Sequence, residues 1–141
     1  DIRVLSDTAK MGLRETALAI IPGAGGTQRL SRLIGYSNAL LWISTARLFD
    51  AAECLRLGVA NIVVPEPELE KVALEVGGEI AANGPIAVQL AKSAIYGGMD
   101  LEMKRALEQE WEHYKQVIPT QDRREALAAF NEKRPPVFKG E

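Results

Sequence analysis

The pattern of apolar and polar positions predicts a helix-rich chain. In most segments apolar residues recur every three or four positions, the spacing that places them on one face of an α-helix. The segment from Thr27 to Ile34 shows this spacing and is followed by Gly35, a residue type that commonly ends a helix. By the same reasoning we expect further helices after Ser37, at 51–57, from Pro67 to Asn83, from Pro85 to Gly98, after Asp100, and from Thr120 to Arg134 at the furthest.

Polar residues at the starts of several of these segments predict helix caps, because a side-chain oxygen there can accept a hydrogen bond from a free backbone N–H. Ser37, Asp100 and Thr120 are expected to act in this way. Asp50 and Glu53 have the spacing of a capping box, with aspartate in place of the usual serine or threonine. The glycine pair at 77–78 destabilises a helix interior by about 1 kcal/mol per residue relative to alanine, which indicates a close helix contact or a kink.

Two short segments predict β-strands: Ile2 to Leu5, which is rich in branched residues, and Asn61 to Val64, which Pro65 ends. Between them, Lys10 to Gly12 is expected to be another short extended piece that leads to Glu15. Ile2 to Leu5 and Lys10 to Gly12 are too short to form a stable sheet by themselves. We therefore expect their partners in a segment that precedes this chain.

A turn rich in glycine stands between an apolar run and the helix predicted from Thr27. Gly23, Gly25 and Gly26 lack side chains, so their N–H groups can lie directly beside a substrate or an ordered water. Two nucleotide-binding motifs do not fit, because Gly-x-Gly-x-x-Gly would require glycine at Gln28 and a P-loop would require lysine at Thr27. The alternative is that the glycines only permit a tight turn from strand to helix.

The residues of this turn, Ile21 to Leu30, closely resemble the enoyl-CoA hydratase (crotonase) family, with Glu15 eight residues before Gly23. The resemblance continues through 51–61, 84–87 and 120–134 and covers essentially the whole chain. The ending, 118–141, most resembles the methylglutaconyl-CoA hydratase-like branch, some of whose members also bind RNA. The resemblance implies an α/β crotonase-like (ββα spiral) fold, here its helix-rich C-terminal half. Within it we expect residues 1–64 to belong to the spiral core and residues 65–141 to form a helical trimerisation region.

Hydration of an enoyl thioester needs a base to activate water, an acid to protonate the α-carbon, and donors for the enolate-like oxygen. Two neighbouring carboxylates can divide the first two roles, since crowding and burial separate their pKa values. The resemblance implies that Glu15 is one of them, the one that delivers the α-carbon proton, and that the Gly23 amide helps to hold the reacting water.

Two further residues match family positions near the substrate. The resemblance places Lys133 near the phosphates of coenzyme A, where a lysine acts as a point charge, and Tyr114 near the ligand. The alternatives are a solvated charge for Lys133 and core packing for Tyr114. Arg29 and Arg32 are expected to form structural pairs.

Compared with the family, the chain begins about halfway along, so a segment of similar size is expected before Asp1. It would hold the second catalytic glutamate, the oxyanion-hole loop and most of the adenine pocket. The chain alone is therefore expected to lack meaningful activity. The expected substrate is an acyl-CoA, with coenzyme A as part of the substrate and no separate cofactor, and the expected assembly is a trimer or a dimer of trimers. Isomerase activity and a non-catalytic assembly module remain alternatives.

Composition narrows the remaining possibilities. A net charge of −2 gives no reason to expect nucleic acid as a partner, so RNA binding rests on the branch resemblance alone. A single cysteine, Cys54, excludes an internal disulfide and a cysteine-rich metal site, and its helical context indicates a packed residue. His113, beside Glu112 and near Lys115, is expected on a solvated helix face, which argues against metal or triad chemistry. The expected compartment is mitochondrial for a eukaryotic source and cytoplasmic for a bacterial one.

Overall fold

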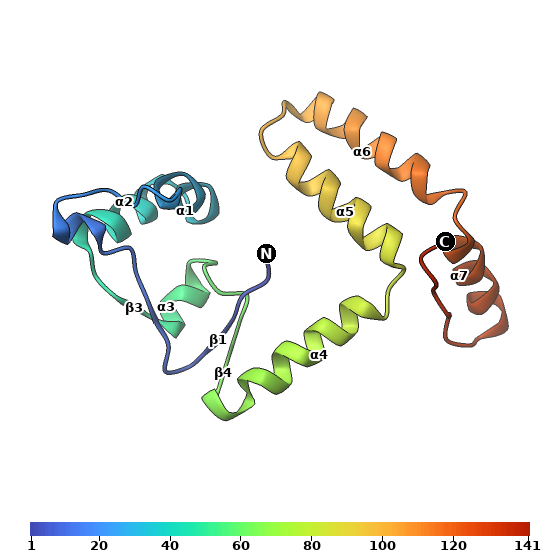
Figure 1. Ribbon diagram of the computed structural model, residues 1–141, viewed down its shortest axis with the longest axis horizontal. Helices are drawn as coiled ribbons and strands as arrows, with labels where there is room; N and C mark the ends of the chain where they lie inside the picture. Colours follow the sequence, from blue (N-terminus) through green and yellow to red (C-terminus); the bar gives the residue numbers. More distant parts are fainter. The chain divides into compact units, whose positions relative to one another are not determined.

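The structure, a computed structural model, describes residues 1–141 and divides into two compact units, 1–75 and 76–141. Helix α4 (Leu69–Ala81) crosses the boundary between them. The order of elements along the chain can be followed in Figure 1. Each unit is described by itself. The expected roles of 1–64 as spiral core and 65–141 as trimerisation region remain predictions.

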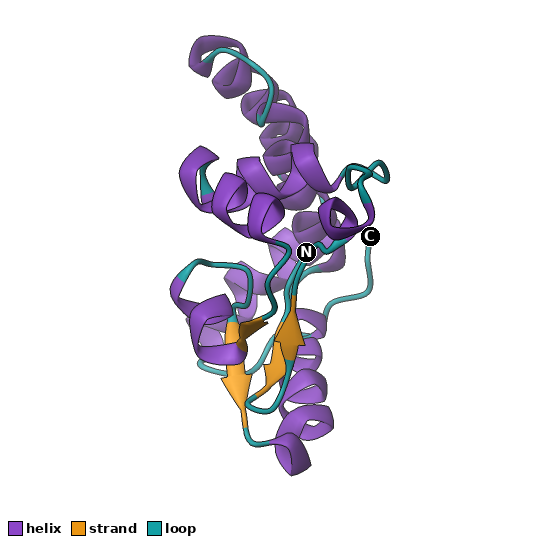
Figure 2. Cartoon of the chain, turned by 90° about the vertical axis from the view of Figure 1, so that its left-hand side faces the viewer, coloured by secondary structure: helices purple, strands orange, loops and turns teal.

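The strands of the first unit form two small sheets (Figure 2). Strand β1 (Val4–Ser6) pairs in parallel with β4 (Ile62–Val64), and β2 (Lys10–Met11) pairs antiparallel with β3 (Phe49–Asp50). The expectation that the first two strands find their partners outside the chain is therefore wrong. A parallel pair needs a long crossover connection, and the intervening helices provide one.

Four helical segments lie between these strands. They are the 3-10 helix η1 (Glu15–Leu18), α1 (Gly26–Ile34), α2 (Tyr36–Thr45) and α3 (Ala51–Arg56). Gly35 has a φ of +80° and forms the break between α1 and α2, a conformation that favours glycine. The predicted cap at Ser37 is wrong, because Gly35 already turns the chain and α2 begins one residue before Ser37.

The cap at the start of α3 is confirmed. The Glu53 N–H donates a hydrogen bond of 2.8 Å to the carboxylate of Asp50. The returning half of the capping box is absent, because the Glu53 carboxylate accepts two hydrogen bonds of 2.6 Å from Arg56, and these lower its pKa. Gly58, with a φ of +78°, follows the end of the helix as expected. A short 3-10 helix, η2 (Glu66–Glu68), leads from β4 into α4.

The core of the first unit gathers around Trp42 and Cys54. The Trp42 side chain is 2% exposed and stacks on Phe49 with ring centroids 4.0 Å apart. Cys54 is fully buried, in line with a packed residue. Burial, with smaller contributions from the negative charges of Asp50 and Glu53, raises the pKa of its thiol.

The second unit contains α5 (Pro85–Gly98), α6 (Met103–Val117) and α7 (Gln121–Glu132). Helices α5 and α6 pack against each other as an antiparallel pair (Figure 1). The predicted cap at Thr120 is confirmed, since its hydroxyl accepts a 3.2 Å hydrogen bond from the Arg123 N–H. The predicted cap at Asp100 is wrong, because α6 begins only at Met103 and Glu102 occupies the capping position.

The structure bears on two further expectations, one of the two explanations offered for the glycine pair at 77–78 and the surroundings of His113. A Cβ added at Gly77 or Gly78 would meet no atom of its own unit within 4 Å, so no close contact explains this pair there. His113 does not lie on a fully solvated face: both of its ring nitrogens are buried and lack hydrogen-bond partners. It stands one helical turn from Gln109, whose side chain lies against Gly97 of α5.

The chain end is fastened to α7 by two acidic side chains. The buried carboxylate of Asp122 accepts hydrogen bonds from the backbone N–H groups of Lys139 (2.7 Å) and Gly140 (2.8 Å). Glu125 accepts hydrogen bonds from both terminal nitrogens of Arg134, at 2.5 and 2.9 Å, and from the Val137 N–H at 2.9 Å. Asp122, in the first turn of α7, therefore also holds the C-terminal tail.

We expect Glu125 to titrate at an unusually low pH. Hydrogen bonds from Arg134, and then from the Val137 N–H, lower its pKa from 4.5 to about 2. A depressed pKa means that the contribution of this group to stability is complete above pH 4.5 and is lost as the pH falls toward 2. Carbon NMR of the Glu125 carboxyl measures this titration. In an Arg134→Gln variant the pKa should move upward, and an unchanged titration would refute the role of Arg134.

Candidate functional site

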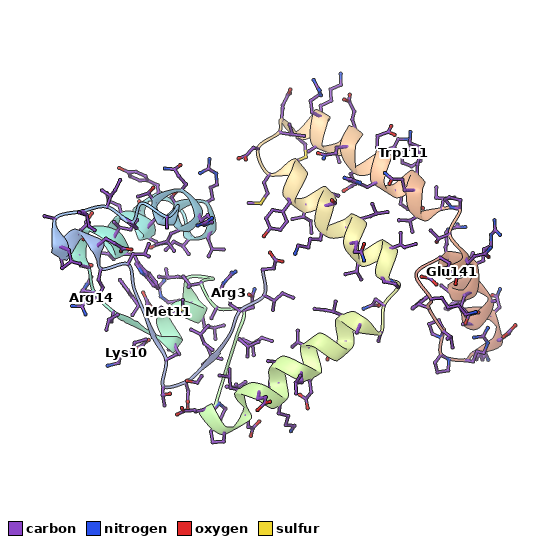
Figure 3. The ribbon with its side chains drawn as sticks, in the orientation of Figure 1. Arg3, Lys10, Met11, Arg14, Trp111 and Glu141 are labelled. Carbon is purple, nitrogen blue, oxygen red and sulfur yellow. The ribbon has the colours of Figure 1, made fainter.

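Glu15 opens the 3-10 helix η1, directly after Arg14, which is labelled in Figure 3. The residue is partly buried, and its Oε2 atom is buried without a hydrogen-bond partner. Buried polar atoms in proteins are nearly always paired, and an unpaired one destabilises the fold by about 1–3 kcal/mol. The carboxylate is therefore available to bond to a ligand or to exchange a proton with one.

The glycine turn follows η1 and leads into α1. Gly25 has a φ of +89°, which favours glycine. A Cβ on Gly26 would lie 2.8 Å from Pro22 Cβ and 3.0 Å from Leu13 Cδ1, too close for a side chain. The interpretation that glycine serves turn geometry therefore holds for Gly25 and Gly26.

Gly23 differs from the other two glycines. It is exposed, has no positive φ, and a Cβ there would meet only the Ile21 carbonyl oxygen, at 3.8 Å. Neither local conformation nor crowding requires glycine at this position. Because glycine has no side chain, a ligand or a water can reach the Gly23 N–H directly, as the predicted water-holding role requires.

The turn and the Glu15 segment lie against each other in the first unit. The close approach of Gly26 to Leu13 joins the start of α1 to a residue two positions before Glu15. Gly12 approaches the chain after α2 still more closely, since a Cβ there would lie 2.5 Å from the Arg47 carbonyl oxygen. These two contacts set the path of the chain into Glu15.

Arg29 and Arg32 make structural contacts, as expected. The Arg29 guanidinium donates a hydrogen bond to the Ala24 carbonyl and covers Gly25. Arg32 donates to the carbonyl and the side-chain oxygen of Gln28, at 3.2 and 3.1 Å. Arg29, in α1, thus stabilises the glycine turn that precedes this helix.

Thr16 forms a contact that the sequence pattern does not predict. Its hydroxyl donates a 2.6 Å hydrogen bond to the Ile43 carbonyl oxygen at the end of α2. The two residues are 27 positions apart, and no local pattern links them. The only signal in the sequence is that Thr16 directly follows Glu15.

The other two predicted site residues lie in the second unit. Tyr114 is 52% exposed and stacks on Trp111 with centroids 5.5 Å apart, so core packing within this chain is not its role. Lys133 is exposed at the C-terminal cap of α7, with a φ of +57°, and its N–H donates to the Phe130 carbonyl. Glu15 and the glycine turn thus belong to the first unit, while Tyr114 and Lys133 belong to the second.

The structure contains neither a cluster of metal-ligating side chains nor a helix that could span a membrane. No group of three histidine, cysteine, aspartate or glutamate side chains is placed to hold a metal ion. None of the helices combines the length and the apolar character needed to cross a membrane.

Comparison with known proteins places these features in a family. The enoyl-CoA hydratase/isomerase family profile matches residues 1–141. Human mitochondrial methylglutaconyl-CoA hydratase is 47% identical over 145 residues, covering 100% of this chain and 43% of the relative. The short-chain-enoyl-CoA hydratase of Clostridium acetobutylicum is 45% identical over 134 residues, covering 95% and 51%.

A solved structure gives the same result. The crystal structure of enoyl-CoA hydratase from Bacillus anthracis matches with a TM-score of 0.99 and 50% identity, covering 100% of this chain and 55% of that one. The chain therefore spans about half the length of the relatives it matches. The predicted crotonase fold is confirmed. With its whole length matched by one family, this chain belongs to the enoyl-CoA hydratase/isomerase family.

Proposed function

We propose that this chain forms part of an enoyl-CoA hydratase-like lyase, which adds water to, or removes it from, the double bond of an acyl-CoA thioester. The observation that carries the proposal is the buried, unpartnered Oε2 of Glu15 in the same unit as the open glycine turn. A carboxylate with no structural partner has no evident role in holding the fold. A bound substrate or water is the kind of group that would complete its hydrogen bonding.

In this proposal Glu15 and Gly23 have different tasks. The Glu15 carboxyl delivers the proton to the α-carbon as the oxygen of water bonds to the β-carbon. The Gly23 N–H donates a hydrogen bond to that water and holds it in place. Lys133 interacts with the coenzyme A phosphates, and Tyr114 lies near the ligand.

A second part of the enzyme is required by the same chemistry. One carboxylate and one amide do not provide the base for water and the donors for the enolate-like oxygen. We propose that a segment equivalent to the uncovered half of the relatives supplies both, together with most of the adenine pocket. Each missing donor or acid–base partner lowers the rate by about a hundredfold or more.

Isomerisation is a second candidate within the family. A single carboxylate can remove a proton from one carbon and return it to another, so Glu15 serves either reaction. The presence of a second catalytic carboxylate in the complementary segment favours hydration, and its absence favours isomerisation.

Assembly is a candidate role of a different class, favoured by the surface of α6. Met103, Leu107 and Trp111 recur at four-residue spacing, and all three side chains are exposed within this chain. Trp111 is labelled on α6 in Figure 3. Exposed apolar stripes of this kind commonly mark protein interfaces. We propose that this region builds a trimer or a dimer of trimers.

Reconstitution tests the proposed function. The chain is mixed during refolding with the part of the Bacillus anthracis hydratase that it does not cover, and hydration of crotonyl-CoA is followed by absorbance. The chain alone should be at least about a hundredfold less active than the intact relative, and the mixture should regain activity. Turnover by the chain alone within about tenfold of the relative would contradict the need for a second part.

The same samples test assembly. Light scattering should give the mass of a trimer or hexamer, and a strictly monomeric mixture would refute the assembly role. We further propose a role in fatty-acid or branched-chain amino acid breakdown, in mitochondria for a eukaryotic source and in the cytoplasm for a bacterial one. The human relative is named as a mitochondrial methylglutaconyl-CoA hydratase.

A further inference from the structure

We propose that Thr16 is a positioning residue for Glu15, which it holds in place by tying η1 to the C-terminal end of α2. This inference rests on the proposed function of Glu15. Its structural basis is the 2.6 Å hydrogen bond from the Thr16 hydroxyl to the Ile43 carbonyl oxygen. The bond joins the residue next to the carboxylate to a helix of the core.

The acceptor is well suited to this task. The last carbonyls of an α-helix have no partner inside the helix and must be satisfied from outside. The Ile43 oxygen accepts the Ala46 N–H at 3.3 Å, where the chain turns with a φ of +50°, and it accepts the Thr16 hydroxyl as well. A carbonyl oxygen has two lone pairs, and the two bonds together use both.

The two ends of the bond differ in how firmly they are held. Ile43 follows Trp42, which is 2% exposed and stacked on Phe49. In and beside η1, by contrast, Leu18 is 74% exposed and Ile20 is 58% exposed. Burial of these side chains within the unit therefore does little to hold η1, and a short 3-10 helix has poor hydrogen-bond geometry of its own. The Thr16 bond links this weakly held segment to a fixed one.

The position of Glu15 depends on the same segment. The Glu15 carbonyl oxygen accepts the Ile20 N–H at 3.2 Å, so the backbone from residue 15 to residue 20 forms one local turn. Misplacing a catalytic group by about 1 Å can lower the rate by about a hundredfold. Without the Thr16 hydroxyl this turn can shift, and the carboxylate moves with it.

Amide hydrogen exchange in the 141-residue chain tests the link directly. Thr16→Val removes the hydroxyl and keeps the branched shape, while Thr16→Ser keeps the hydroxyl as a matched control. Exchange of the Ile20 N–H should accelerate about fivefold in Thr16→Val and stay near the parent value in Thr16→Ser. The Leu57 N–H, which bonds to the Glu53 carbonyl in the same unit, should not change. Equal exchange at Ile20 in all three chains, or equal acceleration at Leu57, would overturn the proposal.

Kinetics in the reconstituted enzyme provide the second readout. Thr16→Val should lower kcat about tenfold with KM unchanged, and Thr16→Ser should restore kcat. A loss that appears in KM alone, or that serine does not restore, would overturn the positioning role. If the reconstituted enzyme with Thr16 intact hydrates no crotonyl-CoA, the proposed function fails, and hydrogen exchange alone then decides whether Thr16 holds the Glu15 segment.

Discussion

Glu15→Gln is expected to lower hydration of crotonyl-CoA by the reconstituted enzyme by roughly a hundredfold to ten-thousandfold. Glutamine has nearly the same shape as glutamate, and Oε2 has no hydrogen-bond partner that the substitution would remove. The amide cannot deliver a proton to carbon, however. The loss should therefore appear in kcat while the fold is retained, which steady-state kinetics and circular dichroism measure together.

A matched substitution distinguishes loss of proton transfer from loss of one negative charge. Glu70→Gln changes an exposed glutamate in the first turn of α4 and should leave kcat within about twofold of the parent. If Glu15→Gln keeps more than about a tenth of the parent activity, Glu15 is not the proton donor. The proposed mechanism would then be wrong even if reconstitution itself succeeds.

Trp42→Ala should be the most destabilising single substitution considered for this chain. The side chain is 2% exposed and stacks on Phe49 at 4.0 Å, so its removal leaves a cavity in the core of the first unit. Truncation of a buried tryptophan typically lowers the free energy of unfolding by about 3–5 kcal/mol. Urea unfolding followed by circular dichroism measures the change.

The second tryptophan provides the control. Trp111 on α6 is 55% exposed, and Trp111→Ala should lower the free energy of unfolding by about 1 kcal/mol or less in the chain alone. Equal destabilisation by the two substitutions would contradict the burial that the structure shows. In an assembled trimer, Trp111→Ala should instead weaken subunit association, which dilution experiments detect.

Much of the fold could be predicted because its signals are local. Helical spacing of apolar residues predicted the segments that became α1, α5 and α7. Gly35 marked the end of α1, and Pro85 and Gly98 marked the two ends of α5. The capping residues show where this reasoning stops. Asp50 and Thr120 cap their helices, whereas Ser37 and Asp100 do not. A suitable side chain caps a helix only where the backbone turns into the helix at that residue.

Some features of the candidate site could likewise be predicted from the sequence, and others required the structure. The glycine turn and its distance from Glu15 are sequence features, and the structure adds which glycines are required by geometry. Gly26 packs against Leu13, and Gly25 has a positive φ, while Gly23 is free of both constraints. The buried nitrogens of His113 could not be predicted, because adjacent charged residues describe only the neighbouring positions of the helix surface.

The amino-acid sequence by itself determined the family, through motifs spread along the whole chain, and most of the helical segments, through the local spacing of apolar residues. It also determined the glycine turn and its separation of eight residues from Glu15. Tertiary structure alone decided that β1 pairs with β4, that Glu15 keeps an unpartnered oxygen, and that Thr16 bonds to Ile43. These features join residues far apart in the chain. Such contacts form only when packing of the core brings distant segments together, and the local sequence pattern does not predict which segments these are.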